Sequence, residues 1–184
     1  MTATRYTGTA ITLHWLMAIM LAGLFALGLY MQGLPLSPEK LKLYSWHKWA
    51  GVGVFILVIV RLAWRFTHRP PVLPEHMARL ERFVAYAGHH MLYLLMFAIP
   101  LSGWLMSSAK GFQTVWFGLL PLPDLLEKNK AMGDLLQTVH WGLNMTLAAI
   151  VLGHVAAALK HHLITKDDVL TRMLPRLTRQ SHKE

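Results

Sequence analysis

Long hydrophobic runs alternate with short charged segments along this chain. Residues 11–31, 83–109 and 135–159 each contain no Asp, Glu, Lys or Arg. A helix needs about 20 apolar residues to cross the hydrocarbon core of a bilayer. Each of these three runs therefore predicts a transmembrane helix.

A fourth span is predicted between the first two of these runs, although its uninterrupted apolar stretch is only about a dozen residues long. Lys48 and Arg61 can extend it if their long side chains reach toward the membrane surface. Trp46, Trp49 and Trp64 lie near its ends, where interfacial aromatic residues are common. A surface helix is the alternative interpretation. We expect four spans, at about residues 11–31, 47–65, 83–109 and 135–160.

A further apolar segment, residues 112–126, is interrupted by Pro121 and Pro123. We expect this segment to lie at the membrane interface, outside the bilayer. The chain of 184 residues is long enough for one domain. The predicted architecture is therefore all-α, with a single membrane domain over residues 1–184.

The composition agrees with a membrane protein, since 54% of the residues are hydrophobic and only 15% are charged, against about 25% charged in soluble domains. The net charge of +9 could indicate nucleic-acid binding. Its distribution argues instead for a topology signal, because Lys and Arg concentrate on the cytoplasmic side of membrane proteins. Four spans put both termini on one side, which would carry twelve basic residues against six. Both termini are therefore expected in the cytoplasm, and the twelve residues are Arg5, Arg61, Arg65, Arg69, Arg79, Arg82, Lys160, Lys166, Arg172, Arg176, Arg179 and Lys183.

Two histidines in the last span, His140 and His154, are separated by fourteen positions. Fourteen residues of α-helix rise about 21 Å and turn through almost four complete turns. The two imidazoles therefore share one helix face at two depths. The predicted topology places His140 at the outer depth, together with His47, and His154 at the inner depth, together with His14.

The inner depth also holds His89 and His90, so spacing alone does not decide which histidines pair there. Ionisable residues inside a span are costly and usually functional, although each could be a neutral histidine bonded to a neighbouring helix. Two histidines from two helices are the axial pair of a b-type haem, whereas zinc takes about four ligands. The chain has no cysteine, so neither an iron–sulfur cluster nor covalent haem attachment is expected.

Glycines at matching positions are consistent with a flat macrocycle between helices, because small residues let backbone approach closely. Gly28 follows His14 by fourteen residues, Gly51 lies one turn from His47, and Gly103 follows His89 by fourteen residues. Ordinary helix packing is the alternative explanation for each of them.

Several motifs resemble the bacterial cytochrome b561 family, which is related to the haem-bearing subunits of hydrogenases and formate dehydrogenases. They are LHW at 13–15, WHKWAG at 46–51, GHHMLY at 88–93, HW and GH within 140–154, HVAAALKHH at 154–162 and KDDVLTRMLPR at 166–176. The resemblance implies a four-helix transmembrane bundle enclosing two b-type haems in the bacterial inner membrane.

The resemblance also implies how the ligands pair. Carried onto this chain, His14 pairs with His154 and His47 pairs with His140. His89 matches a histidine of the third helix that is not usually a ligand, and its role is uncertain. His90 has no assigned role.

Three further residues are expected to contact a quinone or the haem propionates. His161 lies two helical turns after His154 at the inner membrane surface, where a histidine could hydrogen-bond a quinone carbonyl and transfer protons. The resemblance points to the same residue, and a solvated interfacial histidine is the alternative. Arg61 could bind inner haem propionates, as could Arg65, although a charge anchor is the simpler role for Arg65.

The resemblance implies electron transfer from a periplasmic donor to ubiquinone in the membrane, with superoxide as the donor expected for a stand-alone member of the family. Lys40, Lys42, Lys48 and Lys110 could attract a small anion at the outer end, although four nearby acidic residues dilute that charge. The first alternative is an electron-transfer subunit of a partner dehydrogenase or hydrogenase. The second is a histidine-relay transporter of metal ions or protons, against which the spans offer no buried carboxylate. Lipid and quinone are the expected partners, a partner protein is not required, and nucleic acid is not expected.

Overall fold

Four long helices make up most of the protein. The computed structural model describes residues 5–74 and 77–175. Within this part of the chain, α1 spans Gly8–Gln32, α2 Pro38–Thr67, α3 Arg79–Ala109 and α4 Lys130–Lys160. All four are long and apolar enough to cross a membrane, and each contains one of the expected spans. The predicted four-helix transmembrane bundle is confirmed.

The helices begin where polar side chains cap their first turns. Ser37 caps α2 with its hydroxyl, which accepts the backbone N–H of Lys40, and Pro38 occupies the first helical turn. Asn129 caps α4 in the same way by accepting the N–H of Met132. These caps place the first turns of α2 and α4 outside the apolar runs, so both helices extend beyond the expected spans.

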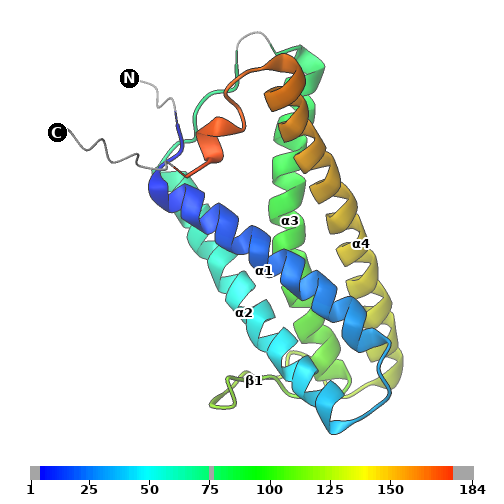
Figure 1. Cartoon of the computed structure of the whole chain (residues 1–184). Helices are drawn as coiled ribbons and strands as arrows, with labels where there is room; N and C mark the ends of the chain where they lie inside the picture. The colour runs from blue at the N-terminus through cyan, green and yellow to red at the C-terminus, as the bar shows by residue number, and fades with distance from the viewer. Residues whose placement is uncertain (1–4, 75–76, 176–184) are drawn as a thin grey trace, which may run out of the picture.

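The bundle is built from two antiparallel helix pairs (Figure 1). α1 packs against α2, α3 packs against α4, and α2 also contacts α3. Leu95 and Ile99 of α3 form a buried apolar cluster with Leu147 of α4. Val54 and Val58 of α2 are almost completely buried. These contacts hold the pairs together through apolar packing.

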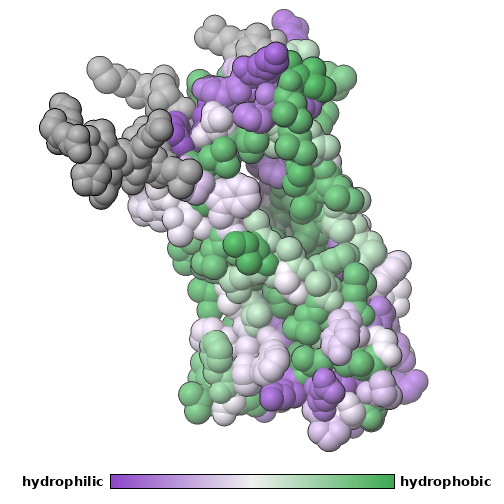
Figure 2. Space-filling model, viewed as in Figure 1, coloured by the Kyte–Doolittle hydropathy of each residue, from purple (hydrophilic) through white to green (hydrophobic). Residues whose placement is uncertain are grey.

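The outside of the bundle is strongly apolar. Ile19, Leu94 and Leu152 keep 70%, 60% and 71% of their surface exposed. Figure 2 shows hydrophobic residues over much of the visible face and hydrophilic residues gathered toward its two ends. Such a large exposed apolar surface would be unfavourable in water, so it indicates contact with lipid.

The loop between α3 and α4 contains a short hairpin that the sequence analysis did not predict. β1 (Val115–Trp116) pairs antiparallel with β2 (Leu120–Pro121). Phe117 and Gly118 both have positive φ angles, of 51° and 72°, which turn the chain between the strands. The hairpin lies beside α2 in Figure 1, and Trp49 of α2 donates its indole N–H to the Val115 carbonyl. This end of the bundle is called the outer end.

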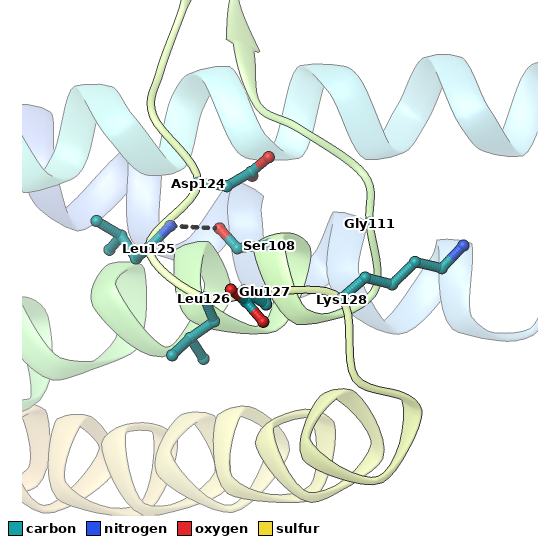
Figure 3. Close-up of a pocket in the computed structure, with 7 residues that line it drawn as sticks. All are labelled: Ser108, Gly111, Asp124, Leu125, Leu126, Glu127 and Lys128. Carbon is teal, nitrogen blue, oxygen red and sulfur yellow. Dashed lines mark hydrogen bonds between the residues drawn. The ribbon is translucent and has the colours of Figure 1, made fainter.

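A small pocket of about 380 Å³ lies where the same loop returns to the end of α3 (Figure 3). The Ser108 hydroxyl accepts the N–H of Leu125 at 3.2 Å and donates to the Trp104 carbonyl. No histidine lines this pocket. Its contacts join the loop to α3, and we assign it a structural role.

The opposite, inner end of the bundle is covered by residues 166–175, called the C-terminal strap. It follows a π-helical turn (His161–Thr165) and includes the 3-10 helix η2 (Thr171–Met173). Figure 1 shows the strap folding back from α4 toward the start of α1. Arg172 donates to the Val72 carbonyl, and Trp15 donates to the Met173 carbonyl. Arg176, Arg179 and Lys183, which contributed to the predicted charge asymmetry, lie outside the described residues.

Candidate functional site

The outer histidine pair consists of His47 on α2 and His140 on α4. Their ring centroids lie 6.5 Å apart, with an interplanar angle of 78°. An imidazole nitrogen binds a metal at about 2.0 Å and lies about 1.1 Å from its ring centroid, so two imidazoles on opposite sides of one metal have centroids about 6.2 Å apart. The outer pair therefore has the spacing of two axial ligands.

Hydrogen bonds determine which nitrogen of His140 carries the proton. Its Nδ1 lies 3.1 Å from the Ile99 carbonyl oxygen and 2.9 Å from the Ser102 hydroxyl oxygen. The Ser102 hydroxyl donates its own proton to the same carbonyl at 2.8 Å. Nδ1 of His140 must therefore be the donor, which leaves the lone pair on Nε2. Metal-binding histidines are commonly oriented by this kind of bond on their second nitrogen.

Two glycines lie directly beside the outer imidazoles. A Cβ on Gly28 would lie 3.5 Å from Cε1 of His47, and a Cβ on Gly103 would lie 3.2 Å from Cε1 of His140. The predicted close approach of backbone is therefore present at these two positions. Nδ1 of His47 is buried and has no hydrogen-bond partner among the described residues, so a nitrogen of this ring is available to a ligand.

The inner pair consists of His14 on α1 and His154 on α4. Their ring centroids lie 6.2 Å apart, with an interplanar angle of 60°. His89 on α3 lies closer to His154, with a centroid separation of 5.5 Å, and bonds through Nδ1 to the Ala85 carbonyl at 2.8 Å. His14, His89 and His154 thus meet at the inner depth, and both His14 and His89 lie near His154. His90 instead has an exposed side chain, whose Nδ1 bonds the Tyr86 carbonyl.

Arg61 lies beside the inner pair. Its Nη2 is 3.1 Å from Nδ1 of His14, and its Nε donates to the Tyr93 hydroxyl at 3.0 Å. A guanidinium can only donate, so Nδ1 of His14 accepts and the ring proton lies on Nε2. His14 can bind a metal through Nε2 only if Arg61 releases Nδ1. Arg65 stacks its guanidinium over the Tyr93 ring, 5.7 Å from the centroid.

Tyr6 lies at the same end, just before α1 begins. Burial raises the pKa of Tyr6, while the nearby charges of Arg65 and Arg61 lower it to a smaller extent. The phenol therefore stays protonated at neutral pH and can act as a hydrogen-bond donor. The inner end thus combines two cationic groups with neutral donors, a set that suits carboxylate groups of a ligand.

One cavity of about 2340 Å³ extends between the two helix pairs and is lined by all four candidate ligands, His14, His47, His140 and His154. Ordinary small-molecule pockets measure about 300–1,000 Å³, so this cavity is large enough for more than one such ligand. Gly51 and Gly88 also line it, and a Cβ at either position would meet no atom within 4 Å. The open space beside these glycines leaves room for a flat ligand.

The donor set distinguishes between kinds of metal centre. No group of three or more His, Asp or Glu side chains within residues 5–74 and 77–175 could hold a metal ion. A bare zinc ion needs about four ligands, whereas iron already held by a macrocycle needs only two axial ones. Paired histidines in a large, mainly apolar cavity therefore fit haem, and they do not form a site for a free ion.

His161 is buried, with 8% of its surface exposed. Its Nδ1 lies 2.6 Å from Oδ2 of Asp167 in the C-terminal strap, and it lines the inner part of the same cavity. The burial argues against the solvated interfacial histidine considered from the sequence. Asp167 and Ser102 were not singled out from the sequence, because only the folded chain brings them to His161 and His140.

Comparisons with known proteins identify the family of the chain. Residues 5–176 match the family model described as prokaryotic cytochrome b561. The chain is 37% identical over 180 residues to cytochrome b561 homolog 2 of Escherichia coli (strain K12), covering 94% of this chain and 93% of that protein.

Two further relatives match over a similar extent. The probable superoxide oxidase CybB of Yersinia pestis is 28% identical over 174 residues, covering 94% of this chain and 97% of that protein. Cytochrome b561 homolog 1 of Escherichia coli (strain K12) is 28% identical over 176 residues, covering 94% and 98%. The chain therefore belongs to the prokaryotic cytochrome b561 family and is a multi-pass membrane b-type cytochrome that transfers electrons.

Proposed function

We propose that the protein binds two haem b groups and transfers electrons across the bacterial inner membrane from superoxide to ubiquinone. His47 and His140 would hold the outer haem, and His14 and His154 the inner one. The observation that carries the proposal is the pair of imidazole contacts at two depths of α4, with centroid separations of 6.5 and 6.2 Å.

The continuous helix α4 sets the distance over which electrons would move. His140 and His154 lie on one face of this helix, about 21 Å apart along its axis. Bound haem supplies reversible one-electron transfer, with a potential set by its ligands and surroundings. The protein's part is to hold the two groups in line, orient the imidazoles and exclude water between them.

The outer end would receive the donor. The Lys48 ammonium lies 3.3 Å from the Ser107 hydroxyl and 3.2 and 3.3 Å from the carbonyls of Phe112 and Gln113. These acceptors are neutral, and the Asp124 carboxylate, whose charge also acts on Lys48, offsets only part of the positive charge at this end, where Lys40, Lys42 and Lys110 add to the attraction of a small anion. The name of the Yersinia pestis relative, a probable superoxide oxidase, supports superoxide as that anion.

The inner end would reduce the quinone. His161 lines the inner part of the cavity and can hydrogen-bond a quinone carbonyl. Reduction of one ubiquinone to ubiquinol would take two electrons from two superoxide ions, with two protons, and release two molecules of O₂. The excess of Lys and Arg at this end favours its placement in the cytoplasm, together with both termini.

The direct test is superoxide-dependent reduction of a short-chain ubiquinone by the purified, haem-loaded protein. We expect quinol formation that needs the protein and is abolished when superoxide dismutase removes the donor. If dithionite-reduced protein reduces ubiquinone but superoxide does not, the donor assignment is wrong. Activity only with a co-purifying dehydrogenase or hydrogenase would identify an electron-transfer subunit of such a complex.

A further inference from the structure

We propose that Asp167 is a positioning residue for quinone reduction, because it fixes the orientation and tautomer of His161. The inference rests on the proposed quinone site and adds the group that prepares its histidine. It follows from how α4 ends, from the contacts of both Asp167 oxygens and from the surroundings of the His161 ring.

The end of α4 brings Asp167 back onto the helix. Residues His161–Thr165 form a π-helical turn, and Lys166 follows with a left-handed φ of 56°. The backbone N–H of Asp167 then donates to the His161 carbonyl at 3.1 Å. Single π turns often occur at functional sites, and here the turn places a carboxylate directly against a histidine of the same helix end.

Both oxygens of the Asp167 carboxylate are held. Oδ2 lies 2.6 Å from Nδ1 of His161, and Oδ1 accepts the backbone N–H of Val169 at 3.0 Å. The His161 and Asp167 side chains are only 11% and 8% exposed. A carboxylate only accepts hydrogen bonds, so Nδ1 of His161 carries a proton. Nε2 is then the nitrogen available to exchange a proton with a ligand.

The surroundings suit a flat apolar molecule with a polar edge. Val169, Leu170 and Met173 of the strap line the same cavity as His161, and Arg172 and Trp15 bind the strap to the rest of the bundle. A quinone has an apolar ring and carbonyl oxygens that accept hydrogen bonds. The structure therefore offers both apolar contact and a single oriented imidazole.

In the proposed step, doubly protonated His161 donates its Nε2 proton to one quinone oxygen as electrons arrive from the bound haem. The ring keeps its Nδ1 proton, which remains bonded to Asp167, and a proton from water at the inner surface restores Nε2. The second proton of the quinol also comes from water. Asp167 stabilises the positive ring without itself becoming protonated, as in other carboxylate–histidine pairs.

Other charged side chains lie near the His161 ring, and one of them provides a control for the experiment. Glu81 at the start of α3 lies close enough for its charge to interact with that of His161, and it is ion-paired with Lys160. Asp168, the next residue after Asp167, instead pairs with Arg172 at 2.8 Å and has a side chain 57% exposed. Asp168 therefore provides a matched acidic residue one position away.

The test compares Asp167→Asn with Asp168→Asn in the haem-loaded protein, following oxidation of the dithionite-reduced haems by a short-chain ubiquinone. The Asn oxygen can keep the Val169 contact, so its amide NH₂ faces Nδ1 and inverts the His161 tautomer. We expect kcat to fall about 10- to 100-fold, less than the roughly 10²–10⁴-fold that a positioned acid or base contributes, because the imidazole itself remains, while KM for quinone changes by less than about twofold.

The outcomes separate this inference from the proposed function. If Asp167→Asn behaves like Asp168→Asn while His161→Ala is slow, Asp167 is not a positioning residue but the quinone site stands. If His161→Ala also reduces quinone at the wild-type rate, the quinone site itself is wrong. Haem content is measured in each variant, and haem loss in Asp167→Asn would overturn the inference in favour of a structural role.

Discussion

The outer and inner histidine pairs have nearly the same centroid spacing but different surroundings. At the outer pair, Ser102 and the Ile99 carbonyl orient His140 so that Nε2 is free to bind. At the inner pair, Arg61 holds Nδ1 of His14, and His89 offers a second neighbour to His154. The outer pair is therefore already oriented for the proposed axial role, whereas Arg61 would have to release His14 before the proposed inner haem could bind.

The difference shows that the centroid spacing of two histidines does not by itself determine whether both can bind one metal. The hydrogen bond on the other ring nitrogen decides which nitrogen can bind. The proposed outer haem should therefore be retained more firmly during purification than the proposed inner haem. The predictions below test the comparison, beginning with the largest expected effect.

Removal of a ligand should remove one haem. His14→Ala and His154→Ala should each reduce the haem content from about two to about one per chain, because an axial position is lost. His47→Ala and His140→Ala should do the same for the other haem. Haem extraction and difference spectra measure both the count and which haem is lost. The pairing is refuted if His14→Ala and His47→Ala remove spectrally identical haems.

Ser102→Ala should weaken only the outer haem. The change removes a partner that orients His140, and loss of such an outer-shell contact costs about 10- to 100-fold in metal affinity. Titration of the haem-free protein with haem measures this. Ser108→Ala is the matched control, since Ser108 is buried on the same helix and bonds Trp104 and Leu125. Equal effects of the two changes would argue against orientation of His140 by Ser102.

Arg61→Gln should weaken binding of the proposed inner haem by about 10- to 150-fold, because the proposed propionate contact is lost and hydrogen bonds to charged groups contribute about 1.5–3 kcal/mol. Arg65→Gln should have a smaller effect, since Arg65 stacks over Tyr93. Haem titration again gives the affinities. Tighter binding in Arg61→Gln would mean that Arg61 acts mainly as a competitor for His14.

His89→Ala should have the smallest effect, with both haems retained. Its ring lies near His154, but it is anchored to Ala85 of its own helix, and the family resemblance gives it no axial role. Haem count and the reduced spectrum check this. Loss of the inner haem would show that His89, rather than His14, is the partner of His154.

The sequence predicted the four helices because their apolar runs are long and nearly free of charge. The early start of α2 was missed, since the charged turn that follows the Ser37 cap lies outside the apolar run. Depth along the helices could be predicted from a rise of about 1.5 Å per residue. The rotation of each helix about its axis could not be predicted in this way. Spacing therefore left both His14 and His89 as possible partners of His154, and only the family resemblance favoured His14.

Contacts that depend on irregular backbone conformations could not be predicted from the sequence. Asp167 reaches His161 only because a π turn and a left-handed Lys166 reverse the chain. The β1–β2 hairpin depends on positive φ angles at Phe117 and Gly118, for which the glycine was the one available signal. In both places the local sequence permits the conformation but does not identify the residue that will be contacted.

The most direct test of the central claim is a dithionite-reduced minus oxidised absorbance spectrum of the purified protein, with haem counted per chain. Two histidine pairs predict b-type bands and about two haems per chain. A single haem per chain under haem-sufficient expression would mean that one pair is not a ligand pair. The absence of haem would contradict both assignments.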